Sequence, residues 1–276
     1  MSTLREKRKK ERRALRRRKT ADWTVVLILC AIAVCCGGYL IYHHWSVKQR
    51  ELEYEKLRQE ETLSAATETV IAEPETEEST EETVIYCDPV YDFGQLHEQN
   101  EDIYAWIVVP GTQVDYPLLQ SETDNYYLDY NLDHSKGYPG CIYTNQCNRK
   151  DFSDYNTVLY GHNMKNLSMF GSLKKYKTED FYKDHQFFTI YTSECAYRYQ
   201  IFAYYDVPET DEVYTVGFAP DDTFQKFIDK MKQKSYDDTG VNVTKDDHIM
   251  TLSTCSTTGK RFVVHAVRIG EHALEK

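Results

Sequence analysis

The longest apolar run of the chain lies near its N-terminus. Residues 24–42 carry no charge, and about twenty apolar residues rising 1.5 Å each span the core of a bilayer. Trp23 and Trp45 bracket the run, as aromatic residues do at membrane interfaces. The pattern therefore predicts a transmembrane anchor over residues 23–45.

A cleaved signal peptide is the alternative interpretation of this run. Its apolar core would be shorter and would end at small residues, whereas His43, His44 and Trp45 follow here. Charge also orients the helix, because eleven Lys and Arg against two Glu give residues 1–19 a net charge of +9. Such a block stays in the cytoplasm, so we expect a basic cytoplasmic tail over residues 1–22 and a domain outside the membrane.

Two polar segments follow the predicted anchor. Residues 46–63 are rich in helix-forming residues with interleaved charges, which predicts a solvated helix. Residues 64–83 contain seven Glu and no basic residue, and such a sequence cannot bury a core. We therefore expect a helical and then disordered acidic stalk over residues 46–85, followed by an extracytoplasmic domain over residues 86–276.

The domain alternates short β-rich runs with turn residues. The runs cover residues 113–119, 140–143, 157–160, 187–191, 197–205, 248–255 and 261–269. Helices are expected over residues 93–100, 169–176 and 223–234, the last because its apolar residues recur at i, i+3, i+4 and i+7. Many strands with few helices indicate a mainly β fold, a closed or nearly closed β-barrel.

Charge and cysteine usage narrow the function. Residues 20–276 carry a net charge of −20, which would repel phosphates, so no nucleic-acid partner is expected. Five cysteines lie outside the apolar run: Cys87, Cys141, Cys147, Cys195 and Cys255. Because five is odd, at least one is expected to be free. Their spacing fits no zinc pattern, no metal or other cofactor is expected, and a redox or metal site at Cys141 and Cys147 is a minor alternative.

The C-terminal runs predict a hairpin that places a thiol beside a guanidinium. Residues 248–255 and 261–269 are separated by five residues that include Gly259, which is typical of an antiparallel hairpin. Cys255 and Arg261 would then face each other at its loop end. The guanidinium is a fixed positive charge that can stabilise a thiolate or an oxyanion. A buried structural cysteine remains the alternative for Cys255.

An acid–base partner for Cys255 has to come from another segment. Along the two strands, His265 would lie about 13 Å away, and His248 and Arg268 about 23 Å away. His162 ends an apolar run and enters a loop after Gly161, a position where sites are often built on rigid scaffolds. His162 is therefore the strongest candidate, and a core or surface histidine is the alternative.

These residues resemble a family. The segment TLSTC that ends at Cys255, with Arg261 six residues later, resembles the active-site hairpin of sortases, and the segment YGHNM around His162 resembles the histidine segment of class B sortases. Further segments resemble this class in its order, at residues 100–107, 111–112, 115–119, 125–128 and 168–171. The resemblance covers residues 86–270.

The resemblance implies a closed eight-stranded sortase-type β-barrel with a few peripheral helices, in a membrane-anchored cysteine transpeptidase of Gram-positive bacteria. Cys255 would attack the carbonyl of a Thr in a C-terminal sorting motif of a secreted protein and form a thioacyl-enzyme. His162 would protonate the leaving amine, and Arg261 would hold the substrate backbone and the oxyanion. An amine of lipid II, the peptidoglycan precursor, or of a pilin would then accept the acyl group.

The same resemblance assigns a peptide groove. Its expected substrate-binding residues, for which ordinary barrel packing is the alternative, are Leu128, Tyr160, Ser253 and Thr254. Residues 207–244 would form an insertion that makes one wall of the groove. Residues 256–258 are small and uncharged where some relatives carry an acid, so a contact from such an acid is not expected here.

Two other functions stay open at this point. A cysteine peptidase would form the same thioacyl intermediate and hydrolyse it, and a non-catalytic anchored binding module would use Cys255 as a core residue. The sequence does not choose the sorting motif or the acceptor amine. It also does not choose among wall anchoring, pilus assembly and haem-uptake substrates.

Overall fold

The computed structural model describes residues 2–68, 91–256 and 258–273. The chain divides into two compact units, Met1–Gln49 and Arg50–Lys276. The first unit consists of α1 (Ser2–Glu68) up to Gln49. Within Trp23–Gln59, α1 contains a run of 18 residues that is apolar enough to cross a membrane. The helix reaches Glu68, whereas most of the predicted disordered stalk lies outside the described residues.

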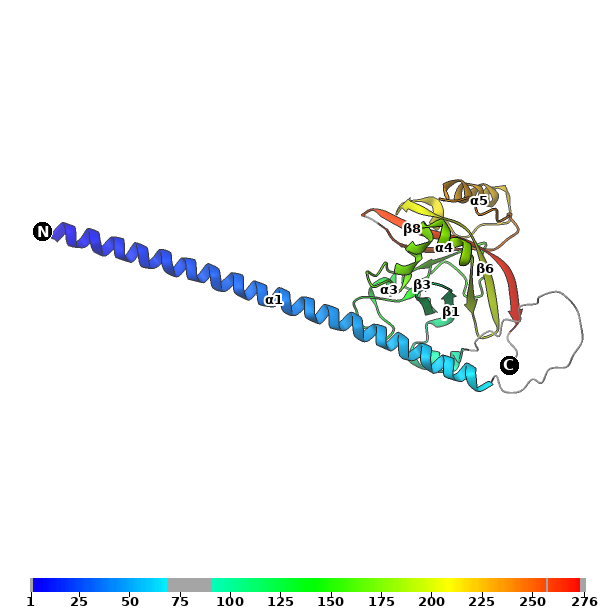
Figure 1. The fold of residues 1–276 in the computed structure, drawn as a ribbon, viewed down its shortest axis with the longest axis horizontal. Coiled ribbons are helices and arrows are strands. Elements are labelled where there is room, and N and C mark those ends of the chain that lie inside the picture. The colour runs from blue at the N-terminus through cyan, green and yellow to red at the C-terminus, as the bar shows by residue number, and fades with distance from the viewer. Residues whose placement is uncertain (1, 69–90, 257, 274–276) are drawn as a thin grey trace, which may run out of the picture. The chain divides into compact units, whose positions relative to one another are not determined.

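The second unit is built on a closed eight-stranded barrel (Figure 1). Its strands are β1 (Ile103–Val109), β2 (Val114–Leu119), β3 (Ile142–Thr144), β4 (Asn156–Tyr160), β5 (Phe187–Tyr191), β6 (Cys195–Pro208), β7 (Ile249–Cys255) and β8 (Lys260–Ala273). Around the barrel they follow the order β1-β2-β3-β4-β7-β8-β6-β5. The pairs β2–β3 and β4–β7 are parallel, and the other six are antiparallel. The predicted fold class is confirmed.

Short helices surround the barrel. They are α2 (Phe93–Gln99), α3 (Tyr126–Asp129), the 3₁₀ helix η1 (Phe170–Lys177), α4 (Glu179–Asp184), the 3₁₀ helix η2 (Glu212–Tyr214) and α5 (Asp222–Lys234). The helix expected over residues 169–176 exists, but as a 3₁₀ helix. The helices α3 and α4 were not predicted, because four and six residues are too few to show a helical period.

The helix α5 packs outside the barrel against β6 (Figure 1). Its N-cap is Asp221, whose side chain accepts hydrogen bonds from the backbone of Thr223 and Phe224, so two of the free donors of the first turn are satisfied. Its apolar stripe is buried at Phe224, Phe227, Ile228 and Met231. The predicted helix is confirmed.

The segment of α1 that belongs to the second unit differs from its prediction. The sequence predicts a solvated helix here, and the helix is present. Its apolar face is covered, however, because Tyr54 and Leu57 are only 4% and 3% exposed in the main hydrophobic core. The prediction of full solvation is wrong because two apolar residues one turn apart were outweighed by the many charges around them.

A chain of hydrogen bonds between buried polar side chains includes one residue from each strand of the β7–β8 hairpin. His265 on β8 is fully buried, with Nδ1 3.0 Å from Thr251 Oγ1 and Nε2 3.0 Å from Tyr205 Oη. The Thr251 hydroxyl donates to Asn156 Oδ1, so it accepts from Nδ1–H, and Nε2 accepts from the Tyr205 hydroxyl. Burial, together with a smaller contribution from the charge of Lys234, lowers the pKa of His265 to about 3, so the ring is neutral.

We expect this histidine to make stability depend on pH. The unfolded chain takes up a proton on His265 below about pH 6.5 and the folded chain does not until about pH 3, so stability is lost as the pH falls through this window. Between pH 7.5 and 5.0, His265 should lower the free energy of unfolding by about 2 kcal/mol. Urea unfolding of detergent-solubilised chain at both pH values measures the loss, and His265→Asn should lack this share. Equal losses in the two proteins would contradict the assignment.

Candidate active site

Strand register brings the two segments with candidate chemistry together. In the parallel pair, Tyr160 of β4 lies opposite Ser253 of β7. His162 and Cys255 each follow these residues by two positions. Both residues therefore emerge at the same end of neighbouring strands, whose backbones lie about 4.8 Å apart in a regular sheet. On the other side of β7, Cys255 pairs with Arg261, as the predicted hairpin requires.

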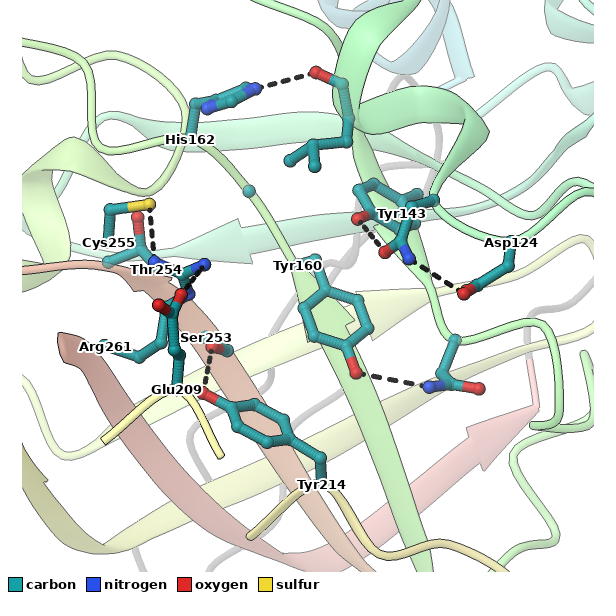
Figure 2. Close-up of a pocket in the computed structure, with 14 residues that line it drawn as sticks. Asp124, Tyr143, Tyr160, His162, Glu209, Tyr214, Ser253, Thr254, Cys255 and Arg261 are labelled. Carbon is teal, nitrogen blue, oxygen red and sulfur yellow. Dashed lines mark hydrogen bonds and ion pairs between the residues drawn. The ribbon is translucent and has the colours of Figure 1, made fainter. Parts of the chain in front are cut away.

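Arg261 contacts both the sulfur and a carboxylate (Figure 2). Its Nη1–H donates to Cys255 Sγ at 3.2 Å, and its Nη2 lies 2.8 Å from Glu209 Oε2. The guanidinium is planar and presents several donors in a fixed fork. One side chain can therefore hold the carboxylate and still direct a donor at the sulfur, which is exposed to solvent.

His162 is oriented by a backbone carbonyl. Its Nε2 lies 2.7 Å from the carbonyl oxygen of Leu128, and since this oxygen can only accept, Nε2 carries the hydrogen. The Tyr138 ring lies 4.9 Å from the imidazole. Gly161 lets the chain reach this position, because a Cβ there would lie 2.8 Å from the Phe170 ring.

The residue after His162 is tied to the backbone of Cys255. The side-chain amide of Asn163 donates to the carbonyl oxygen of Cys255 at 2.7 Å. Two residues earlier in each segment, the N–H of Gly161 donates to the carbonyl oxygen of Ser253. The β4 and β7 chains thus remain bonded to each other past the end of the regular ladder.

A cavity of about 260 Å³ opens at this end of the barrel and includes all three candidate catalytic residues. The four predicted substrate-binding residues, Leu128, Tyr160, Ser253 and Thr254, also line it. The residues that sequence analysis did not single out are Asp124, Asn125, Tyr143, Asn145, Gly161, Glu209 and Tyr214. The structure therefore brings all seven predicted site residues to one cavity, and their individual roles stay predictions.

Three tyrosine rings form an aromatic side of the cavity. The Tyr160 ring lies 5.3 Å from that of Tyr143 and 6.0 Å from that of Tyr214. Burial raises the pKa of Tyr143 and Tyr160, and it raises the pKa of Tyr214 to about 12. The phenols are therefore neutral at physiological pH and can act as hydrogen-bond donors and apolar contact surfaces, not as bases.

Glu209 and Tyr214 both come from the segment after β6. The predicted insertion over residues 207–244 thus contributes to the cavity, through Glu209 and through Tyr214, whose hydroxyl lies 3.1 Å from Ser253 Oγ. Nothing in the sequence around Glu209 and Tyr214 indicates that they line a site. The sequence offers one indirect clue to an acid near Arg261: no acid follows Cys255 directly, where some relatives carry one.

The residues excluded on distance lie elsewhere. His265 is in the core, His248 Nδ1 lies 2.9 Å from the backbone oxygen of Asp154, and Arg268 lies over the Tyr197 ring. Among the cysteines that the structure describes, Cys141 and Cys195 are buried and free, and Cys147 is exposed and free. Cys87 lies outside the described residues.

Comparison with known proteins supports the resemblance. A family profile for the sortase domain matches residues 107–269. The chain is 32% identical to sortase B of Staphylococcus aureus over 248 residues, which is 88% of this chain and 95% of that protein. The chain belongs to the sortase B family. Members of this family are cysteine transpeptidases, so the predicted enzyme class is confirmed.

Other relatives and structures agree with this membership. Sortase B of Listeria monocytogenes is 39% identical over 163 residues, which is 59% of this chain and 66% of that protein. A structure of a Staphylococcus aureus sortase B–substrate complex superposes with a TM-score of 0.68 at 32% identity and covers 80% of this chain and 97% of that one. A Clostridium perfringens sortase B structure gives a TM-score of 0.61 at 30% identity over 65% of this chain and all of that one.

The Glu209–Arg261 ion pair should affect the rate of the enzyme. Both side chains are partly exposed, and such pairs contribute up to about 1 kcal/mol. Glu209→Gln should therefore lower kcat/KM about two- to fivefold, because the guanidinium loses one of its two partners. The measurement is cleavage of a fluorogenic sorting peptide at low and high salt, and high salt should reduce the difference.

A matched control is available on the same segment. Glu212 pairs with Lys230 at 2.9 Å and does not line the cavity, so Glu212→Gln should leave kcat/KM unchanged. Equal effects of the two substitutions would contradict a specific role for Glu209.

Proposed function

We propose that this sortase B cleaves a sorting motif of secreted proteins, with Cys255 as nucleophile, His162 as general acid and base, and Arg261 as the stabiliser of negative charge. The observation that carries the proposal is the 3.2 Å hydrogen bond from Arg261 Nη1 to Cys255 Sγ within a cavity that also contains His162. A permanent cation beside a sulfur favours negative charge on the reacting atoms.

The proposed reaction proceeds in two halves. The Cys255 thiol gives its proton to His162, and the sulfur attacks the carbonyl carbon of the motif's Thr. The C–N bond breaks, the leaving amine takes the proton from His162, and a thioester remains. In the second half an incoming amine loses a proton to His162 and attacks the thioester carbon. The C–S bond breaks, a new amide forms, and His162 returns the proton to the sulfur, which restores the thiol.

The walls of the cavity suit an extended peptide. Leu128 is 38% exposed and presents an apolar side chain, while Tyr160 of β4 and Ser253 and Thr254 of β7 also line the cavity. Apolar walls with a few convergent polar groups are typical of ligand sites. A sortase B from Staphylococcus aureus has been solved as a substrate complex, which supports substrate binding by this chain.

The acceptor is proposed to be an amine of lipid II or peptidoglycan, with a pilin amine as the other candidate.

The apolar stretch of α1 supports an uncleaved single-pass anchor, with the basic N-terminus in the cytoplasm and the catalytic domain outside. Such an enzyme would meet its substrates as they leave the membrane.

Trapping the acyl-enzyme tests the chemistry. Purified chain is mixed with a panel of Thr-containing sorting peptides and is analysed by intact-mass spectrometry. We expect an adduct of one peptide fragment on Cys255 and no adduct on Cys255→Ala, while Cys147→Ala, which changes another exposed cysteine, should react as the unchanged chain does. Normal peptide cleavage by folded Cys255→Ala would exclude Cys255 as the nucleophile.

Adding an amine separates transfer from hydrolysis. With a glycine peptide, or a peptide bearing a free lysine or diaminopimelate amine, the amide product should grow with acceptor concentration at the expense of the hydrolysis product. If hydrolysis alone occurred at all acceptor concentrations, the enzyme would act as a peptidase.

The anchor has its own test. Peptide mapping of the membrane-bound protein should recover the basic segment of residues 1–19, because the apolar stretch is retained. External protease on intact cells should digest the catalytic domain and leave this segment protected. Mature protein that begins after residue 45 would show that the stretch is a signal peptide.

A further inference from the structure

We propose that the α1 segment Arg50–Arg58 positions His162, by fixing the backbone whose carbonyl holds the imidazole. The proposal rests on the proposed catalytic role of His162. We call this segment the docking segment; Tyr54 and Arg50 are its positioning residues. Neither lines the cavity, so both would act through other residues.

The spacing of the docking segment matches one face of a helix. Arg50, Tyr54 and Leu57 stand at i, i+4 and i+7, which places them in line on one side. Tyr54 and Leu57 are almost fully buried, whereas Glu55 and Lys56 are exposed. The segment is therefore packed on one face and solvated on the other.

Tyr54 holds the chain between α3 and β3. Its hydroxyl donates to the carbonyl oxygen of Gly140 at 3.2 Å and lies 3.3 Å from Cys141 Sγ. Complete burial raises the pKa of Tyr54 well above its usual range, so the phenol remains a donor at any physiological pH. A buried hydrogen bond of this kind restrains its acceptor more than an exposed one does.

Arg50 holds the same connection at a second point. Its Nη1 lies 2.7 Å from Asp133 Oδ2, and its Nη2 donates to Ser135 Oγ at 2.7 Å. The guanidinium uses two donors on two residues of one loop, which gives directional as well as electrostatic restraint. Tyr54 and Arg50 together fix the connection from α3 to β3 at residues 133, 135 and 140.

Gly140 transmits this restraint to the carbonyl that holds His162. Gly140 has φ +66°, and a Cβ on it would lie 2.6 Å from the Tyr127 oxygen and 2.9 Å from the Leu128 oxygen. The Gly140 backbone thus packs directly against the carbonyl that accepts from His162 Nε2. The next residue, Cys141, donates its N–H to the Tyr127 oxygen at 3.0 Å. A shift of the Gly140 peptide would therefore move the Leu128 carbonyl.

The docking segment also contacts the loop that follows His162. Glu51 accepts a hydrogen bond from the Asn166 side chain. The Tyr54 ring packs edge-on against Tyr116 at 5.1 Å, and the Tyr116 hydroxyl accepts from the N–H of Met169. The imidazole is thus held through its acceptor on one side and through its own loop on the other.

This arrangement predicts an effect on turnover without an effect on peptide binding. A general acid works only when its ring is held in the productive orientation, whereas the peptide contacts a cavity that the docking segment does not line. In full-length chain in lipid nanodiscs, Tyr54→Phe and Arg50→Gln should each lower kcat about three- to tenfold, as expected for one lost hydrogen bond. KM should stay within about twofold.

Controls separate positioning from stability. Lys56→Gln changes a charge on the exposed face of the same helix turn and should keep kcat. Melting temperature is measured for each variant, and kcat is compared at a temperature where all are folded. Tyr54→Phe retains the buried ring, and Arg50→Gln serves if Tyr54→Phe does not fold.

A readout on the imidazole itself completes the test. In chain labelled with ¹⁵N-histidine, the Nε2–H proton of His162, assigned by its absence in His162→Gln, should exchange with water faster in Tyr54→Phe and in Arg50→Gln than in the unchanged chain. Folded variants with unchanged kcat and an unchanged Nε2–H signal would overturn the proposal, even if their melting temperatures fell. If the unchanged chain processed no peptide, the proposed function would fail and the Nε2–H signal would still decide whether the segment orients His162.

Discussion

The active site depends on the register of one strand. β7 runs parallel to β4 and antiparallel to β8, so the end of β7 has a partner on each side. A shift of one residue would turn Cys255 to the opposite face of the sheet and separate it from Arg261 and from the segment of His162. The backbone hydrogen bonds of the barrel therefore set the relative positions of Cys255, Arg261 and the segment of His162.

Groups outside the barrel strands orient the side chains that the ladder brings together. The strands bring the ends of the segments together, but the ring and the guanidinium acquire their orientations from Leu128 in α3 and Glu209 after β6. Asn163 then links the histidine loop to the backbone of Cys255. The positions of the reacting groups are thus set by the fold, and their directions by loops and short helices.

The sequence predicts the parts of this site that depend on strand pairing. The hairpin signal around Gly259 gives the Cys255–Arg261 pair, and alternating β-rich runs give the barrel. Distance along the strands correctly removes His265 and His248. The end of an apolar run makes His162 the strongest candidate, and the resemblance to class B sortases assigns its role. The pairing with Cys255 itself leaves no local signal, because the parallel pairing of β4 with β7 joins segments about ninety residues apart.

What the sequence does not predict are contacts that depend on tertiary packing. Glu209 lies in a loop without periodicity, so its meeting with Arg261 follows only from the path of the chain after β6. The burial of Tyr54 was missed for a similar reason: one aromatic residue among many charges reads as solvated until the surface it covers is known. The carbonyl of Leu128 carries no sequence information at all, since every residue has one.

The stretch after β6 supplies two neighbours of the reaction centre at once. Glu209 contacts the guanidinium and Tyr214 contacts Ser253 beside the aromatic wall. Under the proposed function, replacing this stretch with its counterpart from another sortase would change the lining of the peptide cavity and the restraint on Arg261 together. A grafted loop would therefore need an acid in place of Glu209 to keep the guanidinium paired.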